Sequence, residues 1–251
     1  MPFIAHRGQR IHYTVEGRGP LVVLQHGLLS TSESWKRAGV VDALSDQFRV
    51  ACVDALGHGL SDKAGEPEPY ALDQLAGDLV AVIDDLGADR AHVVGYSMGA
   101  WMAVGVAKYR RERLASLTVA GWDLVNGVES ARPPGFAREL KFNQFMTLAR
   151  FSTPALVAWV TPEHLPGLRA CWDAARDLTG AEAAVLGVGA PVLLWDGRDD
   201  PYHDPMQAFA DRHGLRFLST AGDHVSALTQ HGAEGAAGLR EFLTQNPRST
   251  M

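Results

Sequence analysis

The chain has 251 residues, of which 46% are apolar and 21% are charged. This length and composition suffice for one main domain with a sizeable core. The 29 acidic and 23 basic residues give a formal net charge of −6, and no basic block is present that could follow a phosphate backbone or an anionic membrane. We therefore expect a small-molecule substrate as the partner and no nucleic acid, and we leave the oligomeric state open.

The two cysteines, Cys52 in an apolar run and Cys171 in a helix-like stretch, indicate neither a disulfide framework nor a metal site. We expect two buried thiols and no metal or other cofactor. The first eight residues lack the apolar segment of a signal peptide, and no run of 18 apolar residues occurs. These features predict a cytoplasmic protein without a membrane span.

Short apolar runs alternate with helix-length amphipathic segments along the chain, which is typical of strands joined by helical crossovers. An alternating run at 11–15 predicts an early strand, and apolar residues recurring every three or four positions between 72 and 86 predict a crossover helix. Apolar runs predict further strands, covered on both faces, at 21–24, 50–53, 93–94, 117–119, 192–195 and 216–218. The predicted fold class is α/β, with a mostly parallel central sheet flanked by helices.

This alternation lapses between residues 121 and 189, and we interpret the segment 121–189 as an inserted helical cap on a core formed by residues 1–120 and 190–251. The segment is rich in aromatic residues, which commonly line small-molecule pockets. They are Phe136, Phe142, Phe145, Phe151, Trp159 and Trp172. Any one of them could instead pack the cap onto the core, but as a group they predict an apolar entrance.

The segment Gly95-Tyr96-Ser97-Met98-Gly99 matches the Gly-x-Ser-x-Gly pattern of a nucleophile elbow. A strand-like run precedes it, and a helix-like run at 100–107 follows it. A sharp turn from strand to helix needs small flanking residues, which Gly95 and Gly99 provide. The turn would place the hydroxyl of Ser97 at the carboxyl edge of the sheet, near the positive end of the following helix. Ser97 is therefore the candidate nucleophile.

With this motif the chain resembles the α/β-hydrolase superfamily over nearly its whole length. The likeness is to the cap-bearing group of esterases, lactonases, carbon-carbon bond hydrolases and cofactor-free haloperoxidases. The segment 26–28, His-Gly-Leu, is similar to the oxyanion loop of that family, and 54–61 resembles its turn after the next strand. The resemblance implies the α/β-hydrolase fold. It also implies an oxyanion hole formed by the backbone N–H groups of Leu28 and Met98.

Each of these two loops carries a histidine, His26 in the first and His58 in the second. Both residues lie in turns bounded by glycine, where an imidazole ring can bond to nearby backbone groups. We therefore interpret His26 and His58 as residues that shape their loops.

A serine hydroxyl needs a base to become a nucleophile, and the base needs an orienting acid. Asp199 and Asp200 follow the strand at 192–195, and His224 follows the last strand. The resemblance implies that Asp200 is the acid and His224 the base, in the order Ser, Asp, His that this fold uses. Asp199 is then a solvated neighbour or a turn cap, and Asp196 is expected in the turn.

Two alternatives stay open for these assignments. Asp123 follows the strand at 117–119, and some members of the superfamily draw their acid from that region. His231 is a second candidate base, although it lies farther past the last strand, where the terminal helix is expected to begin.

A serine at the elbow favours acyl transfer, in which Ser97 attacks a carbonyl, His224 passes the proton to the leaving group, and water completes the turnover. We expect cleavage of an ester, lactone or thioester of a small to medium-sized apolar substrate. The candidate pocket residues are Leu29, Tyr96, Trp122, Phe145 and Trp159. The alternative reactions are those of a carbon-carbon bond hydrolase or a cofactor-free perhydrolase with the same triad. The alternative from a different class is a small-molecule receptor that keeps the hydrolase fold.

Overall fold

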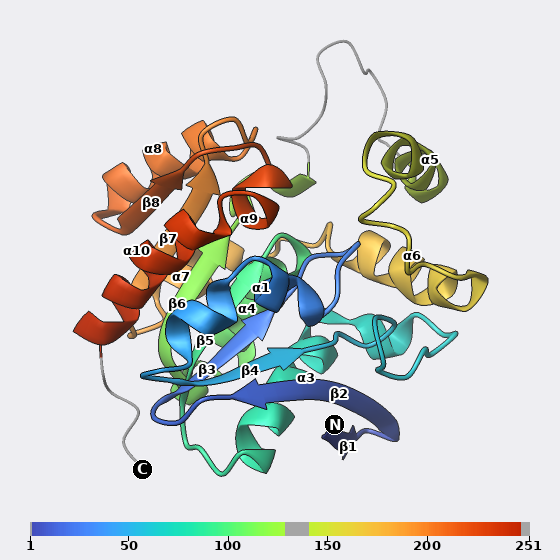
Figure 1. The fold of residues 1–251 in the computed structure, drawn as a ribbon, viewed down its shortest axis with the longest axis horizontal. Coiled ribbons are helices and arrows are strands. Elements are labelled where there is room, and N and C mark those ends of the chain that lie inside the picture. The colour runs from blue at the N-terminus through green and yellow to red at the C-terminus, as the bar shows by residue number, and fades with distance from the viewer. Residues whose placement is uncertain (1, 129–140, 247–251) are drawn as a thin grey trace.

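In the computed structural model, which describes residues 2–128 and 141–246, eight strands form one sheet in the order β1-β2-β4-β3-β5-β6-β7-β8 (Figure 1). The pairs β1–β2 and β2–β4 are antiparallel, and all the other neighbours pair in parallel. The strands are β1 Phe3–His6, β2 Gln9–Glu16, β3 Leu21–Gln25, β4 Arg49–Val53, β5 Ala91–Tyr96, β6 Leu114–Ala120, β7 Val192–Gly197 and β8 Arg216–Thr220. This arrangement confirms the predicted α/β class with a mostly parallel sheet.

The first strand, β1, has no counterpart among the predicted strands. It has four residues and pairs with β2 across a tight turn at Arg7 and Gly8, whose φ angles are 53° and 75°. Such a short edge strand has little hydrophobic pattern of its own. It forms because β2 supplies its hydrogen-bond partners.

The described helices are α1 Glu33–Arg37, α2 Val40–Leu44, α3 Leu72–Asp85, α4 Met98–Tyr109, α5 Phe142–Ser152, α6 Leu165–Ala174, α7 Ala181–Leu186, α8 His203–His213, α9 Ser226–Thr229 and α10 Gly232–Gln245. Helix α3 confirms the predicted crossover helix. It buries Leu75, Leu79 and Ile83, which lie four residues apart on one face. None of the helices in the two described ranges combines the length and apolar character that crossing a membrane requires.

The sheet lies between two helical layers, each with its own apolar cluster. Residues of α3, α4, α7 and α8 pack on one face, and residues of α1, α2 and α10 pack on the other. In β7, Leu194 faces the first layer and Trp195 the second, which explains why the central strands are apolar without alternation. The same strand extends further than predicted, because Asp196 is part of β7 and buried instead of lying in the turn.

Helices α5 and α6 lie apart from the helices that cover the sheet (Figure 1). They share a small apolar cluster formed by Leu29, Phe142, Met146, Ala149, Val157 and Leu168. Helix α7 differs, because its Ala181 and Val185 belong to the main core. Phe136 lies outside the described residues. The cap boundaries at 121 and 189 therefore stay a prediction.

Candidate active site

Ser97 lies in a strained turn between β5 and α4. Its φ and ψ angles are 57° and −121°, a conformation that side-chain-bearing residues rarely adopt. The flanking glycines make the turn possible: a Cβ on Gly95 would lie 2.0 Å from the carbonyl oxygen of Gly99, and one on Gly99 would lie 2.1 Å from that of Gln25. The Ser97 amide donates to the carbonyl oxygen of Ala120 at 2.8 Å, which ties the turn to β6.

Three side chains from distant parts of the sequence meet at this turn. Ser97 Oγ and His224 Nε2 are 3.0 Å apart, and His224 Nδ1 lies 2.8 Å from Asp200 Oδ2. The Asp200 side chain is fully buried, whereas the His224 side chain is 34% exposed. A buried carboxylate beside one ring nitrogen favours a proton there, which leaves Nε2 free to accept the serine proton. The arrangement can therefore carry a proton away from Ser97.

The other acidic candidates occupy different environments. Asp199 is exposed, as predicted for a solvated neighbour. The Asp123 carboxylate is buried and accepts hydrogen bonds from the amides of Val125 and Asn126 at 2.7 and 2.9 Å. This is the pattern of an aspartate that caps its own turn. The ring of His224 lies against Asp200 instead.

The second candidate base, His231, directly precedes α10, as the sequence predicted. The ring that contacts Ser97 is that of His224. Two aromatic residues flank it: the ring centroid of Tyr96 lies 5.7 Å away, and that of Tyr202 lies 5.4 Å away. The Tyr202 amide also donates to Asp200 Oδ1 at 3.0 Å, so both carboxylate oxygens of Asp200 have partners.

Sequence reasoning missed Tyr202. The Asp-Pro step at 200–201 was the available signal, because aspartate at such a turn often accepts a hydrogen bond from the amide two residues later.

The loop after β3 passes directly beside Ser97. A Cβ on Gly27 would lie 3.1 Å from the Ser97 Cβ, so the loop comes this close because residue 27 has no side chain. Met98 is the first residue of α4, where an amide has no acceptor within the helix. Within residues 2–128 and 141–246, no hydrogen bond is made by the amide of Leu28 or of Met98. The amides of Leu28 and Met98 therefore stay the predicted oxyanion donors.

Histidines 26 and 58 bond to the backbone, which confirms their predicted loop-shaping role. His26 Nδ1 lies 2.8 Å from the carbonyl oxygen of Gly27, and His58 Nε2 lies 2.6 Å from that of Leu28. Burial lowers the pKa of both rings, that of His58 to about 3. Both rings are therefore neutral at pH 7.

The five candidate pocket residues fall into two groups. Tyr96 and Trp122 are both 3% exposed, and the Tyr96 hydroxyl donates to the carbonyl oxygen of His224 at 2.9 Å. Leu29, Phe145 and Trp159 belong to or pack against the apolar cluster of α5 and α6. Phe145 stacks on Trp172 with the ring centroids 4.4 Å apart. Which of them line a pocket stays a prediction.

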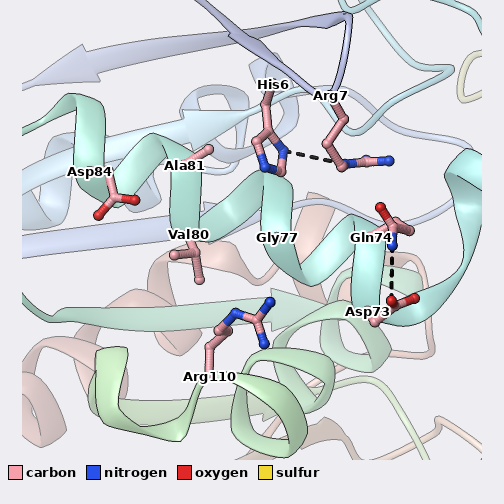
Figure 2. A pocket seen from close by; sticks show the side chains of 9 residues that line it. All are labelled: His6, Arg7, Asp73, Gln74, Gly77, Val80, Ala81, Asp84 and Arg110. Atoms are coloured by element: carbon pink, nitrogen blue, oxygen red, sulfur yellow. Dashed lines mark hydrogen bonds between the residues drawn. The ribbon is translucent and has the colours of Figure 1, made fainter.

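A separate hollow of about 200 Å³ lies between α3 and the turn after β1. Figure 2 shows the side chains that line it. It is lined by His6, Arg7, Asp73, Gln74, Gly77, Val80, Ala81, Asp84 and Arg110. Arg110 directly follows the last residue of α4, whereas Ser97 directly precedes the first. A helix of 12 residues is about 18 Å long at 1.5 Å per residue. The hollow is therefore not part of the site around Ser97.

Comparisons with known proteins agree with this architecture. The chain is 31% identical over 215 residues to pimeloyl-[acyl-carrier protein] methyl ester esterase of Nitrosomonas europaea, covering 76% of this chain and 81% of that one. It is 37% identical over 116 residues to epoxide hydrolase B of Mycobacterium tuberculosis. That match covers 44% of this chain and only 32% of the relative.

Among solved structures, the enol-lactonase of Burkholderia xenovorans LB400 superposes with a TM-score of 0.74, covering 97% of this chain and 100% of that one at 24% identity. At this identity the likeness shows the fold alone. The family model described as alpha/beta hydrolase fold matches residues 20–175, which is more than half of the chain. The chain therefore belongs to the α/β-hydrolase family.

Proposed function

We propose that this protein is a serine hydrolase that cleaves an ester, lactone or thioester through an acyl-enzyme intermediate. One observation carries the proposal: Ser97, His224 and Asp200 form a continuous chain of contacts at 3.0 and 2.8 Å. Ser97 is the nucleophile, His224 the general base and then the general acid, and Asp200 the group that orients His224 and stabilises its protonated form.

In the proposed reaction, Ser97 Oγ adds to the substrate carbonyl carbon while His224 Nε2 takes the serine proton. The carbonyl oxygen becomes negative and receives hydrogen bonds from the amides of Leu28 and Met98. Fixed backbone dipoles suit this task because they need little reorganisation. The intermediate collapses, the leaving group takes the proton from His224, and a water molecule activated by the same ring hydrolyses the acyl-enzyme.

The relatives support an acyl-transfer reaction in different degrees. The relative from Nitrosomonas europaea, which matches along most of both chains, is named as a methyl ester esterase. The relative named as an epoxide hydrolase matches over a shorter part. Attack of Ser97 on an epoxide would form an ether, which has no carbonyl carbon that water could attack. A serine at residue 97 therefore favours carbonyl substrates.

The substrate is proposed to be small to medium-sized and apolar beside its scissile carbonyl. Support comes from the apolar cluster that Leu29 forms with residues of α5 and α6. Leu28, in the loop at residues 26–28, packs against this cluster. Each additional methylene that enters an apolar pocket contributes up to about 0.8 kcal/mol, or close to fourfold in kcat/KM, until the pocket is full. Activity across an acyl-chain series should rise and then fall.

The decisive experiment assays p-nitrophenyl esters of increasing chain length, simple lactones, a thioester and a vinylogous diketone with the native protein and with Ser97→Ala. Ester or lactone turnover that disappears in Ser97→Ala supports the proposal. Turnover of the diketone alone would instead indicate the carbon-carbon bond hydrolase. A protein that binds these compounds without Ser97-dependent turnover would be a receptor on the hydrolase fold.

A further inference from the structure

Three consecutive carbonyl oxygens in the loop after β3 each accept a hydrogen bond from a side chain. The three donor side chains come from three different parts of the chain. Gly27 O lies 2.8 Å from His26 Nδ1, Leu28 O lies 2.6 Å from His58 Nε2, and Leu29 O accepts from Trp159 Nε1 at 3.2 Å. His26 belongs to the loop itself, His58 to the loop after β4, and Trp159 to the segment between α5 and α6. We call residues 27–29 the oxyanion strip.

The first contact has a defined proton position. The Ala55 amide donates to His26 Nε2 at 3.1 Å, so this nitrogen is an acceptor and the ring proton is on Nδ1. His26 Nδ1–H therefore donates to Gly27 O. That oxygen and the Leu28 amide belong to one planar peptide unit and point in opposite directions. Fixing the oxygen also fixes the direction of the Leu28 N–H group, which is the proposed oxyanion donor.

The second contact is also directional. The neutral His58 ring has a single N–H, and its two nitrogens face Leu28 O at 2.6 Å and Leu56 O at 3.1 Å. We assign the proton to Nε2, because its contact with Leu28 O is the shorter of the two. The ring centroid of Trp159 lies 5.8 Å from that of His58, so the second and third donors also touch each other.

The third donor is the one that comes from the segment predicted to be a cap. The ring of His164 also packs against Trp159, at a centroid distance of 4.8 Å with the planes nearly perpendicular. Leu29, whose carbonyl oxygen receives the indole N–H, buries its side chain in the cluster formed with α5 and α6. The helices α5 and α6 are therefore linked to the oxyanion strip in two ways. The Trp159 side chain bonds to the backbone of Leu29, and the Leu29 side chain packs in their cluster.

We propose that Trp159 is a positioning residue that links the segment carrying α5 and α6 to the oxyanion strip. The catalytic part of this inference rests on the proposed function. Trp159 touches no reacting atom; it holds Leu29 O and thereby limits rotation of the peptide units that present the Leu28 amide. Its loss should weaken binding of the negatively charged oxygen more than binding of the uncharged substrate.

The test compares Trp159→Phe with Trp172→Phe. The first variant keeps an aromatic ring against His58 and His164 but removes the N–H donor. The second is a matched control in the same segment: Trp172 stacks on Phe145, and its indole N–H makes no hydrogen bond within residues 2–128 and 141–246. Two readouts apply to both variants: amide hydrogen exchange of the peptides that cover residues 26–31, and kinetics with a short p-nitrophenyl ester.

Binding of a trifluoromethyl ketone is measured as well, because its adduct with Ser97 carries the negative oxygen that the uncharged substrate lacks. Ser97 Oγ adds to the ketone carbon, the serine proton moves to His224, and the ketone oxygen becomes an anion at the oxyanion strip. Complete loss of one oxyanion donor costs about a hundredfold or more, so its misplacement should cost roughly tenfold. We expect Trp159→Phe to lower kcat and ketone affinity by this factor and to leave KM within about twofold. Exchange at 26–31 should become faster in Trp159→Phe and should keep its native rate in Trp172→Phe.

The outcomes test three claims separately: the link between Trp159 and residues 26–31, its positioning role in catalysis, and the proposed function. Unchanged exchange at 26–31 in Trp159→Phe overturns the link itself. Faster exchange with unchanged kcat and ketone affinity, or a loss confined to KM, overturns the positioning role. A native protein without Ser97-dependent turnover contradicts the proposed function and with it the catalytic half of the inference, and the exchange comparison still decides the link.

Discussion

The hydroxyl group of Tyr96 donates a hydrogen bond of 2.9 Å to the backbone carbonyl oxygen of His224. The residue directly before Ser97 therefore holds the loop that carries the proposed base, across 128 positions of sequence. Burial, and then the charge of Asp200, raise the pKa of Tyr96 well above its ordinary value, so the hydroxyl stays protonated and remains a donor. This contact joins the end of β5 to the loop after β8 without using either reacting side chain.

We expect Tyr96→Phe to lower kcat about three- to tenfold, because the loop at residue 224 loses one anchor while the triad side chains remain. The lost hydrogen bond should also reduce the free energy of unfolding by about 0.5–1.5 kcal/mol. Steady-state kinetics and urea unfolding measure the two effects. Tyr109→Phe is the control, because Tyr109 is exposed at the end of α4. Equal activity in both phenylalanine variants would contradict the anchoring role.

We expect Ser97→Ala and His224→Ala each to remove nearly all hydrolysis without unfolding the protein. The two residues act as one unit, so the double variant should be little slower than either single variant. Turnover by all three, together with circular dichroism, provides the comparison. Multiplicative losses in the double variant would show that Ser97 and His224 act independently.

The Asp200→Asn variant should lower kcat by about three to four orders of magnitude, because an amide favours the wrong histidine tautomer and carries no charge. Asp199→Asn is the matched control one residue earlier, where the side chain is exposed, and it should change kcat less than about twofold. If Asp200→Asn kept full activity while Asp123→Asn lost it, the acid would lie at the end of β6.

Asp196 should make the protein less stable as the pH rises. Burial, and then repulsion from Asp200, raise the pKa of Asp196 well above its ordinary value, and its Oδ1 makes no hydrogen bond in the described part of the structure. The unfolded chain loses this proton near its ordinary pKa of about 4, whereas the folded chain retains it to higher pH. Above about pH 4 the folded state therefore binds more protons, and stability falls with rising pH until the folded-state pKa is passed.

The comparison variant is Asp196→Asn, which has nearly the same shape and no titrating proton. We expect the difference in melting temperature, variant minus native protein, to be larger at pH 8 than at about pH 4. Asp199→Asn should follow the native curve at both values. Parallel pH profiles for the native protein and Asp196→Asn would show that Asp196 does not titrate differently on folding.

The predicted positions of the strands along the chain, the crossover helix at α3 and the elbow at Ser97 rest on local signals in the sequence. Apolar periodicity reports which face of a segment is buried, and the glycines at 95 and 99 report where the backbone must turn sharply. These signals lie within a few residues of one another, so a single sequence contains them. Strand β1 and the extension of β7 through Asp196 are missing from that prediction because pairing and burial by neighbouring strands create them.

The contacts of the site depend on the tertiary structure. The sequence places Asp123, Asp199 and Asp200 after strands, and only the assembled sheet decides that Asp200 is the carboxylate against His224. Likewise, composition marks the segment 121–189 as aromatic, but packing decides that Phe151 is 88% exposed while Trp159 reaches Leu29. A side chain's partner depends on which segments the fold brings within a few ångströms, and no local pattern encodes that distance.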